Sequence, residues 1–209
     1  MTDRDRVTID TTSTPWTEVY KRLIEVVVPR PIALVSTVDR EGRTNLAPYS
    51  FFTVVSNNPP YLAFSPSRSA RTGELKDTLK NILAMGEFVV AVVNEGIAEA
   101  VNQAAATLPQ GRSEFEYAGL TPAQSERVRP PLVAESPVNM ECELVEVRTY
   151  GREGGAGNLV VGRVVLIHLA STVLDPEGRV LHDRLKAVGR MGGEAWVRTR
   201  DVFALKRPE

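Results

Sequence analysis

The sequence predicts a mainly β protein, an antiparallel barrel with two short helices inserted between strands. Runs of β-branched and aromatic residues, bounded by turn residues, recur along its 209 residues. Two long apolar segments, 139–151 and 158–171, are separated only by the glycine-rich stretch GREGGAGN. Neighbouring strands elsewhere also connect through short turns. Such connections favour antiparallel pairing over alternating βαβ units.

The chain is expected to begin its barrel with a hairpin. PRPIALVSTV (29–38) is a β-branched run, and the turn-forming DREG leads into GRTNLAPYSFFTVV (42–55). Pro48 interrupts this second segment. Because proline cannot donate a hydrogen bond to a sheet, it belongs at an edge, a bulge or a strand start. SNNPP is a further break, and a short strand follows at 61–65.

Two helices are expected on either side of a buried strand. After the loop SPSRSARTG, KDTLKNILAMG (76–86) has apolar residues at helical spacing. Asp77 or Thr78 is its expected N-cap and Gly86 its C-terminal stop. The apolar EFVVAVV then forms the buried strand, and the alanine-rich IAEAVNQAAATL (97–108) forms the second helix.

The second half of the chain is expected to start with a long loop, 109–137. Structureless connections of this length are uncommon in compact domains and are usually functional or docked on a partner. The strand 139–151 then places Met140, Cys142 and Leu144 on one face. The final segments are rich in turns and end in the extended VFALK. No internal repeat or linker divides the chain, so we expect a single domain over 1–209 with its core at about 15–205.

Composition excludes several classes of function. Lys and Arg total 25 against 26 Asp and Glu, a net charge of −1, which provides no broad basic field for nucleic acid or an anionic membrane. The first twenty residues are polar and show no secretory signal. The longest clean apolar run, FVVAVV, is far shorter than the ~18 residues of a membrane helix. We therefore expect a soluble, cytoplasmic protein that binds neither nucleic acid nor membrane.

The usual catalytic constellations are missing from the sequence. His168 and His182 lie on different elements with no metal-ligand spacing, and His168 is interpreted as a structural residue of an apolar strand. Cys142 is the single cysteine and is interpreted as a core residue, so no cysteine-rich metal site is expected. No glycine-rich phosphate loop joins a strand to a helix. A protein of this kind would perform redox chemistry through a cofactor, with no catalytic side chain of its own.

The best candidate for a ligand-binding segment is SPSRSARTGELKDTLKNI (65–82). Its loop carries Ser65, Ser67 and Arg68, and the helix start carries Lys76. The free N–H groups of a helix N-terminus attract phosphate, and nearby cations add charge-assisted hydrogen bonds. A solvated loop followed by an ordinary capped helix is the equally weighted alternative.

Six ordered blocks of the sequence resemble the flavin reductase-like family of FMN-binding split-barrel proteins. The first block is RPIALVSTVDREGRTNLAPYSFF (30–52), and FSPSR with KDTLKNI and EFVV follows it. The later blocks are EAVNQ, SEFEYAGLTP, PPLVAESPVNMECEL, and GRMGG with Trp196. The resemblance covers about residues 15–205. Trp196 stands where this family more often has tyrosine, and Ala104 stands where a hydroxyl residue is expected.

The resemblance implies a six-stranded antiparallel Greek-key split barrel that forms a homodimer, with FMN beside the subunit interface. It implies that Ala47–Phe52 lines the isoalloxazine, that backbone groups near Ser50–Phe52 face its N5/O4 edge, and that segment 65–81 holds the ribityl chain and phosphate. For Phe51 and Phe52, simple core packing is the alternative, and alternation predicts it for at least one of them. The implied cofactor-contact residues are Ser36, Thr37, Asn45, Ala47, Pro48, Tyr49, Ser50, Phe51, Phe52, Ser65, Ser67, Arg68, Lys76, Thr78 and Asn81.

The function implied is an NAD(P)H-dependent FMN reductase in which nicotinamide passes a hydride to flavin N5. Its reduced flavin would supply a partner monooxygenase or another acceptor protein. A flavoredoxin-like FMN electron carrier, reduced by a protein donor, is the first alternative, and a non-catalytic FMN-binding dimer is the second. FMN and FAD, and NADH and NADPH, are all compatible with these residues.

Overall fold

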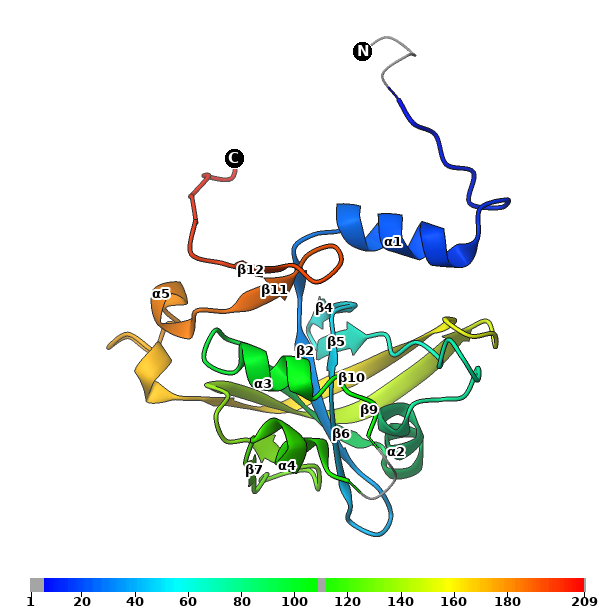
Figure 1. Cartoon of the computed structure of the whole chain (residues 1–209). Helices are drawn as coiled ribbons and strands as arrows, with labels where there is room; N and C mark the ends of the chain where they lie inside the picture. The colour runs from blue at the N-terminus through cyan, green and yellow to red at the C-terminus, as the bar shows by residue number, and fades with distance from the viewer. Residues whose placement is uncertain (1–5, 109–111, 209) are drawn as a thin grey trace.

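The computed structural model describes residues 6–108 and 112–208, and a seven-stranded antiparallel sheet forms its centre (Figure 1). This confirms the expected mainly β, antiparallel architecture. The sheet has seven strands because the segment 44–57 supplies two of them, one at each edge. In spatial order the strands are β3 (Thr44–Tyr49), β2 (Ala33–Val38), β6 (Glu87–Val92), β9 (Val138–Tyr150), β10 (Gly157–Leu169), β5 (Pro60–Phe64) and β4 (Phe52–Asn57).

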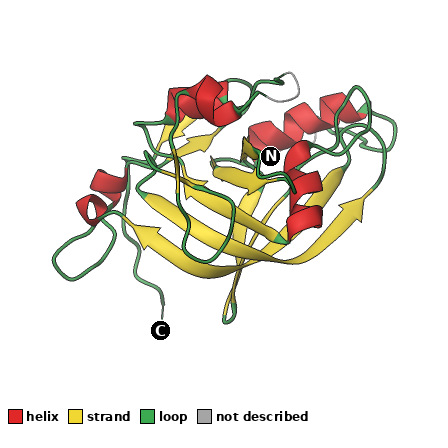
Figure 2. Ribbon diagram, turned by 90° about the horizontal axis from the view of Figure 1, so that it is seen from below, coloured by secondary structure: helices red, strands yellow, loops and turns green. Residues whose placement is uncertain are grey.

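The sheet curls on itself, and Figure 2 shows the curvature of its long strands. Tyr49 of edge strand β3 and Phe64 of β5, near the opposite edge, have ring centroids 5.2 Å apart. Phe64 also contacts Phe88 of β6, with centroids 5.5 Å apart. These contacts across the curled sheet close a barrel interior. The barrel remains split between the edge strands β3 and β4, which are joined by residues 50–51.

The barrel interior is packed tightly around Phe88. A Cβ atom added to Gly162 on β10 would lie only 2.2 Å from the Phe88 ring, so only glycine fits there. Met140, Cys142 and Leu144 pack in or against the same cluster, as the alternation of β9 predicted. Aliphatic side chains from the strands and the helix α2 (Asp77–Met85) complete it: Ala33, Val35, Leu62, Leu79, Ile82, Val90 and Val160.

A second apolar cluster covers the other face of β2. It joins Leu34 and Leu46 of the sheet to Val101, Phe115 and Val133 of the covering segments. The segment expected to be mostly loop, 109–137, is loop over most of its described part, 112–137, but it also contains three short elements that apolar residues such as Phe115 hold against the sheet. Residues 109–111 lie outside the described chain. The covering elements are α3 (Ala98–Gln103), α4 (Glu114–Ala118), β7 (Pro122–Ala123) and β8 (Leu132–Val133).

The helix α2 ends where it was predicted to end, but its N-cap differs from the prediction. It ends before Gly86, whose φ of 74° is the left-handed conformation expected of a C-terminal stop. Its N-cap is Lys76, without a side-chain cap, so Asp77 and Thr78 do not cap it. Thr78 is instead buried, with its hydroxyl directed to the sheet. The predicted second helix, α3, ends at Gln103 and is shorter than expected.

Pro48 lies inside β3, where it pairs with Leu34 of β2. Since β3 is an edge strand, the missing N–H costs no bond to a further strand, which agrees with the edge position allowed for it by the sequence. The expected interruption at Pro48 is wrong in position. The break falls at Ser50 and Phe51, between β3 and β4.

An N-terminal helix, α1 (Trp16–Val26), was not predicted from the polar start of the chain. It contains no buried residue, and Trp16, Tyr20 and Leu23 are all exposed. Arg30 holds its C-terminal end, since Nη1 donates to the carbonyl oxygens of Ile24 at 2.6 Å and Val27 at 3.0 Å.

A smaller three-stranded sheet completes the fold. Its order is β1 (Arg30–Pro31), β11 (Val188–Arg190) and β12 (Trp196–Arg198). The short helices η2 (Ser171–Val173) and α5 (His182–Leu185) precede β11 in the chain. Helix α1 and the C-terminal segment lie at the same end of the molecule as this sheet (Figure 1). Within the described residues, no helix is long and apolar enough to cross a membrane.

Candidate functional site

The start of α2 lies against β2 and β3, which brings two distant segments of the sequence together. Thr78 Oγ1 donates to Asn45 Oδ1 at 3.4 Å, and Asn81 Nδ2 donates to Thr37 Oγ1 at 3.1 Å. Thr37 and Thr78 are buried, and each has its hydroxyl paired with an asparagine amide, so two hydrogen-bonded pairs fasten the start of α2 to β2 and β3. All four belong to the predicted cofactor-contact set.

Lys76 and Tyr49 meet at the border of this cluster. Lys76 Nζ lies 5.8 Å from the centroid of the Tyr49 ring, and partial burial of the ammonium lowers the pKa of Lys76. The Tyr49 hydroxyl is buried near Thr78 but forms no hydrogen bond of acceptable geometry, and burial raises the pKa of Tyr49. No carboxylate in the described chain lies within ion-pair distance of Lys76. Its charge is therefore available to an anionic ligand.

The loop before α2 is fastened to the tip of the β9–β10 hairpin. The Arg68 N–H donates to the Ala156 carbonyl at 2.8 Å, and Ser67 forms a β-bridge with Gly157. The Arg68 guanidinium turns back on its own loop, where Nη1 donates to the Gly73 carbonyl at 2.9 Å. Its Nε is buried without a partner among the described residues. Arg68 is thus fixed in position while retaining a free donor.

The residues around the break between β3 and β4 have different surroundings. Ala47 and Phe52 pack against the interior cluster, as alternation predicted for one of the two phenylalanines, whereas Phe51 is 42% exposed. The Phe51 carbonyl accepts a hydrogen bond from the Ser65 N–H at 2.9 Å, which joins the break to the loop before α2. Ser50 Oγ accepts a hydrogen bond from Arg30 Nε at 3.3 Å.

Ser36 and Thr37 were both predicted to contact the cofactor, but they lie on opposite faces of β2, because neighbouring residues of a strand point to opposite faces. Thr37 faces α2, as its bond to Asn81 shows. Ser36 shares the face of Leu34, which packs in the cluster beneath α3 and α4, and its buried hydroxyl has no partner. The structure therefore separates Ser36 from the cluster at α2.

The donor set fits a nucleotide that carries a phosphate. Two buried side-chain atoms near this junction, Tyr49 Oη and Arg68 Nε, lack a hydrogen-bond partner among the described residues, and both belong to predicted contact residues. Leaving such groups unpaired costs about 1–3 kcal/mol each. Arg68 is half-buried and Lys76 is exposed, and neither forms an ion pair within the described chain, so both cations are available to a ligand. An anion with several oxygens would satisfy this junction.

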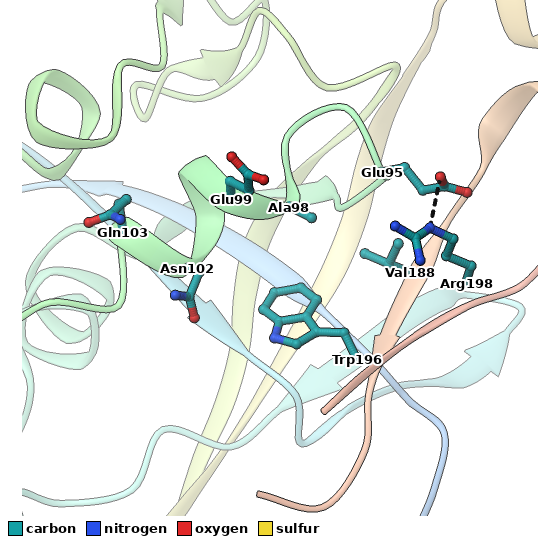
Figure 3. Close-up of a pocket in the computed structure, with 8 residues that line it drawn as sticks. All are labelled: Glu95, Ala98, Glu99, Asn102, Gln103, Val188, Trp196 and Arg198. Atoms are coloured by element: carbon teal, nitrogen blue, oxygen red, sulfur yellow. Dashed lines mark hydrogen bonds and ion pairs between the residues drawn. The ribbon is translucent and has the colours of Figure 1, made fainter. Parts of the chain in front are cut away.

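Two adjoining cavities lie on the other side of β3, beside α3. Their volumes are about 460 Å³ and 210 Å³, and Asn102 and Trp196 line both. In Figure 3 the Trp196 indole lies below α3, near Asn102, and the Arg198–Glu95 ion pair lies at the far side of the larger cavity. Pro48 and Ser50 reach the smaller cavity. It thus adjoins the stretch predicted to line the isoalloxazine.

Sequence reasoning missed Arg30 and Asn102 as site residues. Arg30 opens the block RPIALV, and Asn102 lies in EAVNQ, so both stood within recognisable blocks without an assigned role. Arg30 is 5% exposed and connects Ser50 to α1 and, through Nη2, to the Met191 carbonyl at 2.9 Å. Burial lowers the pKa of Arg30.

His168 and Cys142 have structural surroundings, which agrees with their interpretation from the sequence. His168 Nε2 lies 2.6 Å from Oε1 of Glu141, whose buried carboxylate also accepts three backbone N–H bonds from residues 126–128. Cys142 is fully buried, and burial raises the pKa of its thiol, which disfavours the reactive thiolate.

Comparison with known proteins identifies a family for this chain. Residues 26–187 match the family model described as flavin reductase like domain. The chain is 40% identical to the uncharacterized protein YwrF of Bacillus subtilis over 194 residues, covering 91% of this chain and 94% of YwrF.

Solved structures are similar over nearly their whole length. Nitrilotriacetate monooxygenase component B from Bacillus cereus superposes with a TM-score of 0.90 at 38% identity, covering 96% of this chain and 98% of that one. The 2-nitrobenzoate 2-nitroreductase NbaA of Pseudomonas fluorescens superposes with a TM-score of 0.86 at 30% identity, covering 97% and 96%. The chain belongs to the flavin reductase-like family of flavoproteins.

Proposed function

We propose that this flavoprotein binds FMN and acts as an NAD(P)H-dependent flavin reductase. One observation carries the proposal: two cations without ion-pair partners, Arg68 and Lys76, flank a loop-to-helix junction that is bonded to the strands β2 and β3. In a chain of the flavin reductase-like family, such a junction suits the phosphate of a flavin nucleotide.

The two ends of the flavin would contact different segments. Arg68 and Lys76 bind the phosphate, with the hydroxyls of Ser65 and Ser67 beside them. The isoalloxazine lies along residues 47–52, where the break between β3 and β4 exposes backbone groups. The hydrogen bond from the Ser65 N–H to the Phe51 carbonyl joins the two segments.

When bound, the flavin accepts a hydride from nicotinamide at N5 and passes electrons to a later acceptor. The protein's part is to bind and align the two rings and to exclude water from them, which can supply a large share of the rate. His168 is hydrogen-bonded to Glu141 and Cys142 is fully buried, so neither is proposed as a general acid or base in this reaction.

A homodimer and a protein acceptor complete the proposal. Helix α1 exposes Trp16, Tyr20 and Leu23, and the exposed Phe51 and Val54 lie at the β3–β4 break and on β4. Apolar residues of this size, exposed on neighbouring elements, suit burial against a second copy of the chain. Likeness to a monooxygenase component B supports the proposal that the protein delivers reduced flavin to a monooxygenase.

The test is the oxidation of NADH or NADPH by the purified protein with added FMN or FAD. Continuous loss of the reduced-nicotinamide absorbance, dependent on flavin, is expected. Tightly bound flavin without nucleotide oxidation would support the electron carrier instead. A colourless protein that binds no added flavin would overturn the proposed function, because the reductase and the electron carrier both require a flavin.

A further inference from the structure

The smaller cavity beside α3 combines apolar sides with a polar group at one end. Its apolar lining consists of Ile32, Pro48, Val101, Ala105 and the Trp196 indole. Ser50, Asn102 and Arg190 supply its polar groups. Pockets of this composition are typical of small organic ligands, in which the apolar surface takes the body of the molecule and a few polar groups set its orientation.

The charge on the lining of this cavity is one-sided. Arg190 lines it and no acidic residue does, whereas Glu95 and Glu99 line only the adjoining larger cavity. The Arg190 guanidinium lies 5.1 Å from the centroid of the Trp196 ring and donates from Nη2 to the Gly193 carbonyl at 2.6 Å, but within the described chain it has no carboxylate partner. The neighbouring Arg198 and Arg200 both pair with Glu95.

A second guanidinium reinforces this imbalance from behind Ser50. Arg30 donates to the Ser50 hydroxyl at 3.3 Å, and its other donors bond only to backbone carbonyls. The described residues place no carboxylate within ion-pair distance of it. Two arginines without counter-ions therefore act on the same small volume, where low dielectric surroundings strengthen their attraction for an anion.

We propose that this cavity binds a planar aromatic carboxylate, with its ring between the apolar side chains and its carboxylate on Arg190. The guanidinium fork matches the two oxygens of a carboxylate, and the Asn102 amide and Ser50 hydroxyl provide further donors. A volume of about 210 Å³ suits a single ring. Larger substituents extend past Asn102 and Trp196 into the adjoining cavity.

The binding itself does not require the proposed reductase function, but one consequence rests on it. Pro48 and Ser50 also belong to the stretch proposed to line the isoalloxazine. A carboxylate ligand in this cavity would therefore lie beside the flavin and restrict access of nicotinamide to it. Small aromatic acids would then inhibit flavin reduction.

The test is a titration of the full-length protein with benzoate, without flavin or nicotinamide, followed by calorimetry. Benzamide, a neutral molecule of nearly the same shape, is the matched control ligand. We expect benzoate to bind at least about tenfold more tightly than benzamide, because only the carboxylate pairs with an arginine. Arg190→Ala should remove this preference, and Arg200→Ala, which loses the same charge outside the cavity, should retain it.

Two further variants keep the result interpretable if Arg190→Ala fails to fold. Arg190→Lys retains the charge but loses the fork and should bind benzoate with intermediate affinity. In Trp16→Phe, Trp196 becomes the single tryptophan of the chain, and benzoate should change its fluorescence. Equal binding of benzoate and benzamide, or equal loss in the Arg190 and Arg200 variants, would overturn the proposal. Because flavin and nicotinamide are absent from the titration, these outcomes are independent of reductase activity.

Discussion

We expect Lys76→Ala to weaken FMN binding and to leave the binding of riboflavin, which lacks the phosphate, almost unchanged. The Lys76 side chain forms no ion pair or hydrogen bond in the described chain, and its ammonium lies 5.8 Å from the centroid of the Tyr49 ring. A cation–π contact at such a site contributes only about 0.5–1 kcal/mol, so the fold should tolerate the change. A hydrogen bond from a charged donor contributes about 1.5–3 kcal/mol, so the dissociation constant for FMN should rise roughly 10- to 100-fold.

The assay is titration of flavin fluorescence at equilibrium, with Lys80→Ala as the matched control. Lys80 lies on the same helix and carries the same charge, but it pairs with Asp77 at 2.9 Å on the exposed side. The control should bind FMN as the unsubstituted protein does. The reasoning is refuted if both variants lose FMN affinity equally, or if riboflavin binding falls as much as FMN binding.

Three further predictions address the fold and its assembly. Glu141→Gln should lower the free energy of unfolding at neutral pH by about 1–3 kcal/mol. Burial alone would raise the pKa of Glu141, but three backbone N–H donors and His168 bind the carboxylate and lower its pKa in the folded protein. The substitution weakens these charged hydrogen bonds. Because the pKa of Glu141 is lower in the folded than in the unfolded protein, this stability is present above about pH 4.5 and is lost as the pH falls through the folded pKa. Urea unfolding at a series of pH values measures the loss. It should be seen in the unsubstituted protein and in the control variant Glu143→Gln, and should be smaller in Glu141→Gln. Gly162→Ala should cost about 1–3 kcal/mol by thermal unfolding, since its methyl group would overlap the aromatic ring beneath it, whereas Gly96→Ala should cost little; equal effects would contradict the packing. Leu23→Asp should shift light scattering at micromolar concentration from dimer toward monomer, and an unchanged dimer would place the interface away from α1.

The sheet could be predicted because its strands are apolar runs bounded by turn residues. The segment 139–171 became the β9–β10 hairpin, and EFVVAVV became the buried strand β6. Gly86 marked the end of α2 because a left-handed residue is needed there. These are local signals that a single sequence carries.

Other parts of the fold depend on contacts between distant segments. Helix α1 begins after Pro15 without a side-chain cap and buries no residue, so neither capping nor a core face marked it. The helix and strands within 114–133 are short. They are held in place by the burial of Phe115 and Val133 in the apolar cluster beneath them. The alternation of side chains along a strand predicts that Ser36 and Thr37 point to opposite faces of the sheet. Which of these faces packs against α2 is known only from the tertiary structure.

The candidate site shows the same division. The loop-to-helix junction at 65–82 is contiguous, and its serines, arginine and lysine could be recognised together. The cavity beside α3 combines Ile32, Ser50, Val101 and Trp196 from four separate segments. No local pattern indicates that Arg190 lacks a counter-ion there while Arg198 has one. That distinction requires the tertiary structure.

A crystal structure of the protein with FMN tests the central claim most directly. The account predicts the phosphate within hydrogen-bond distance of Arg68 or Lys76, and the isoalloxazine edge along residues 50–52. A phosphate bound elsewhere, with this junction free of ligand, would contradict it.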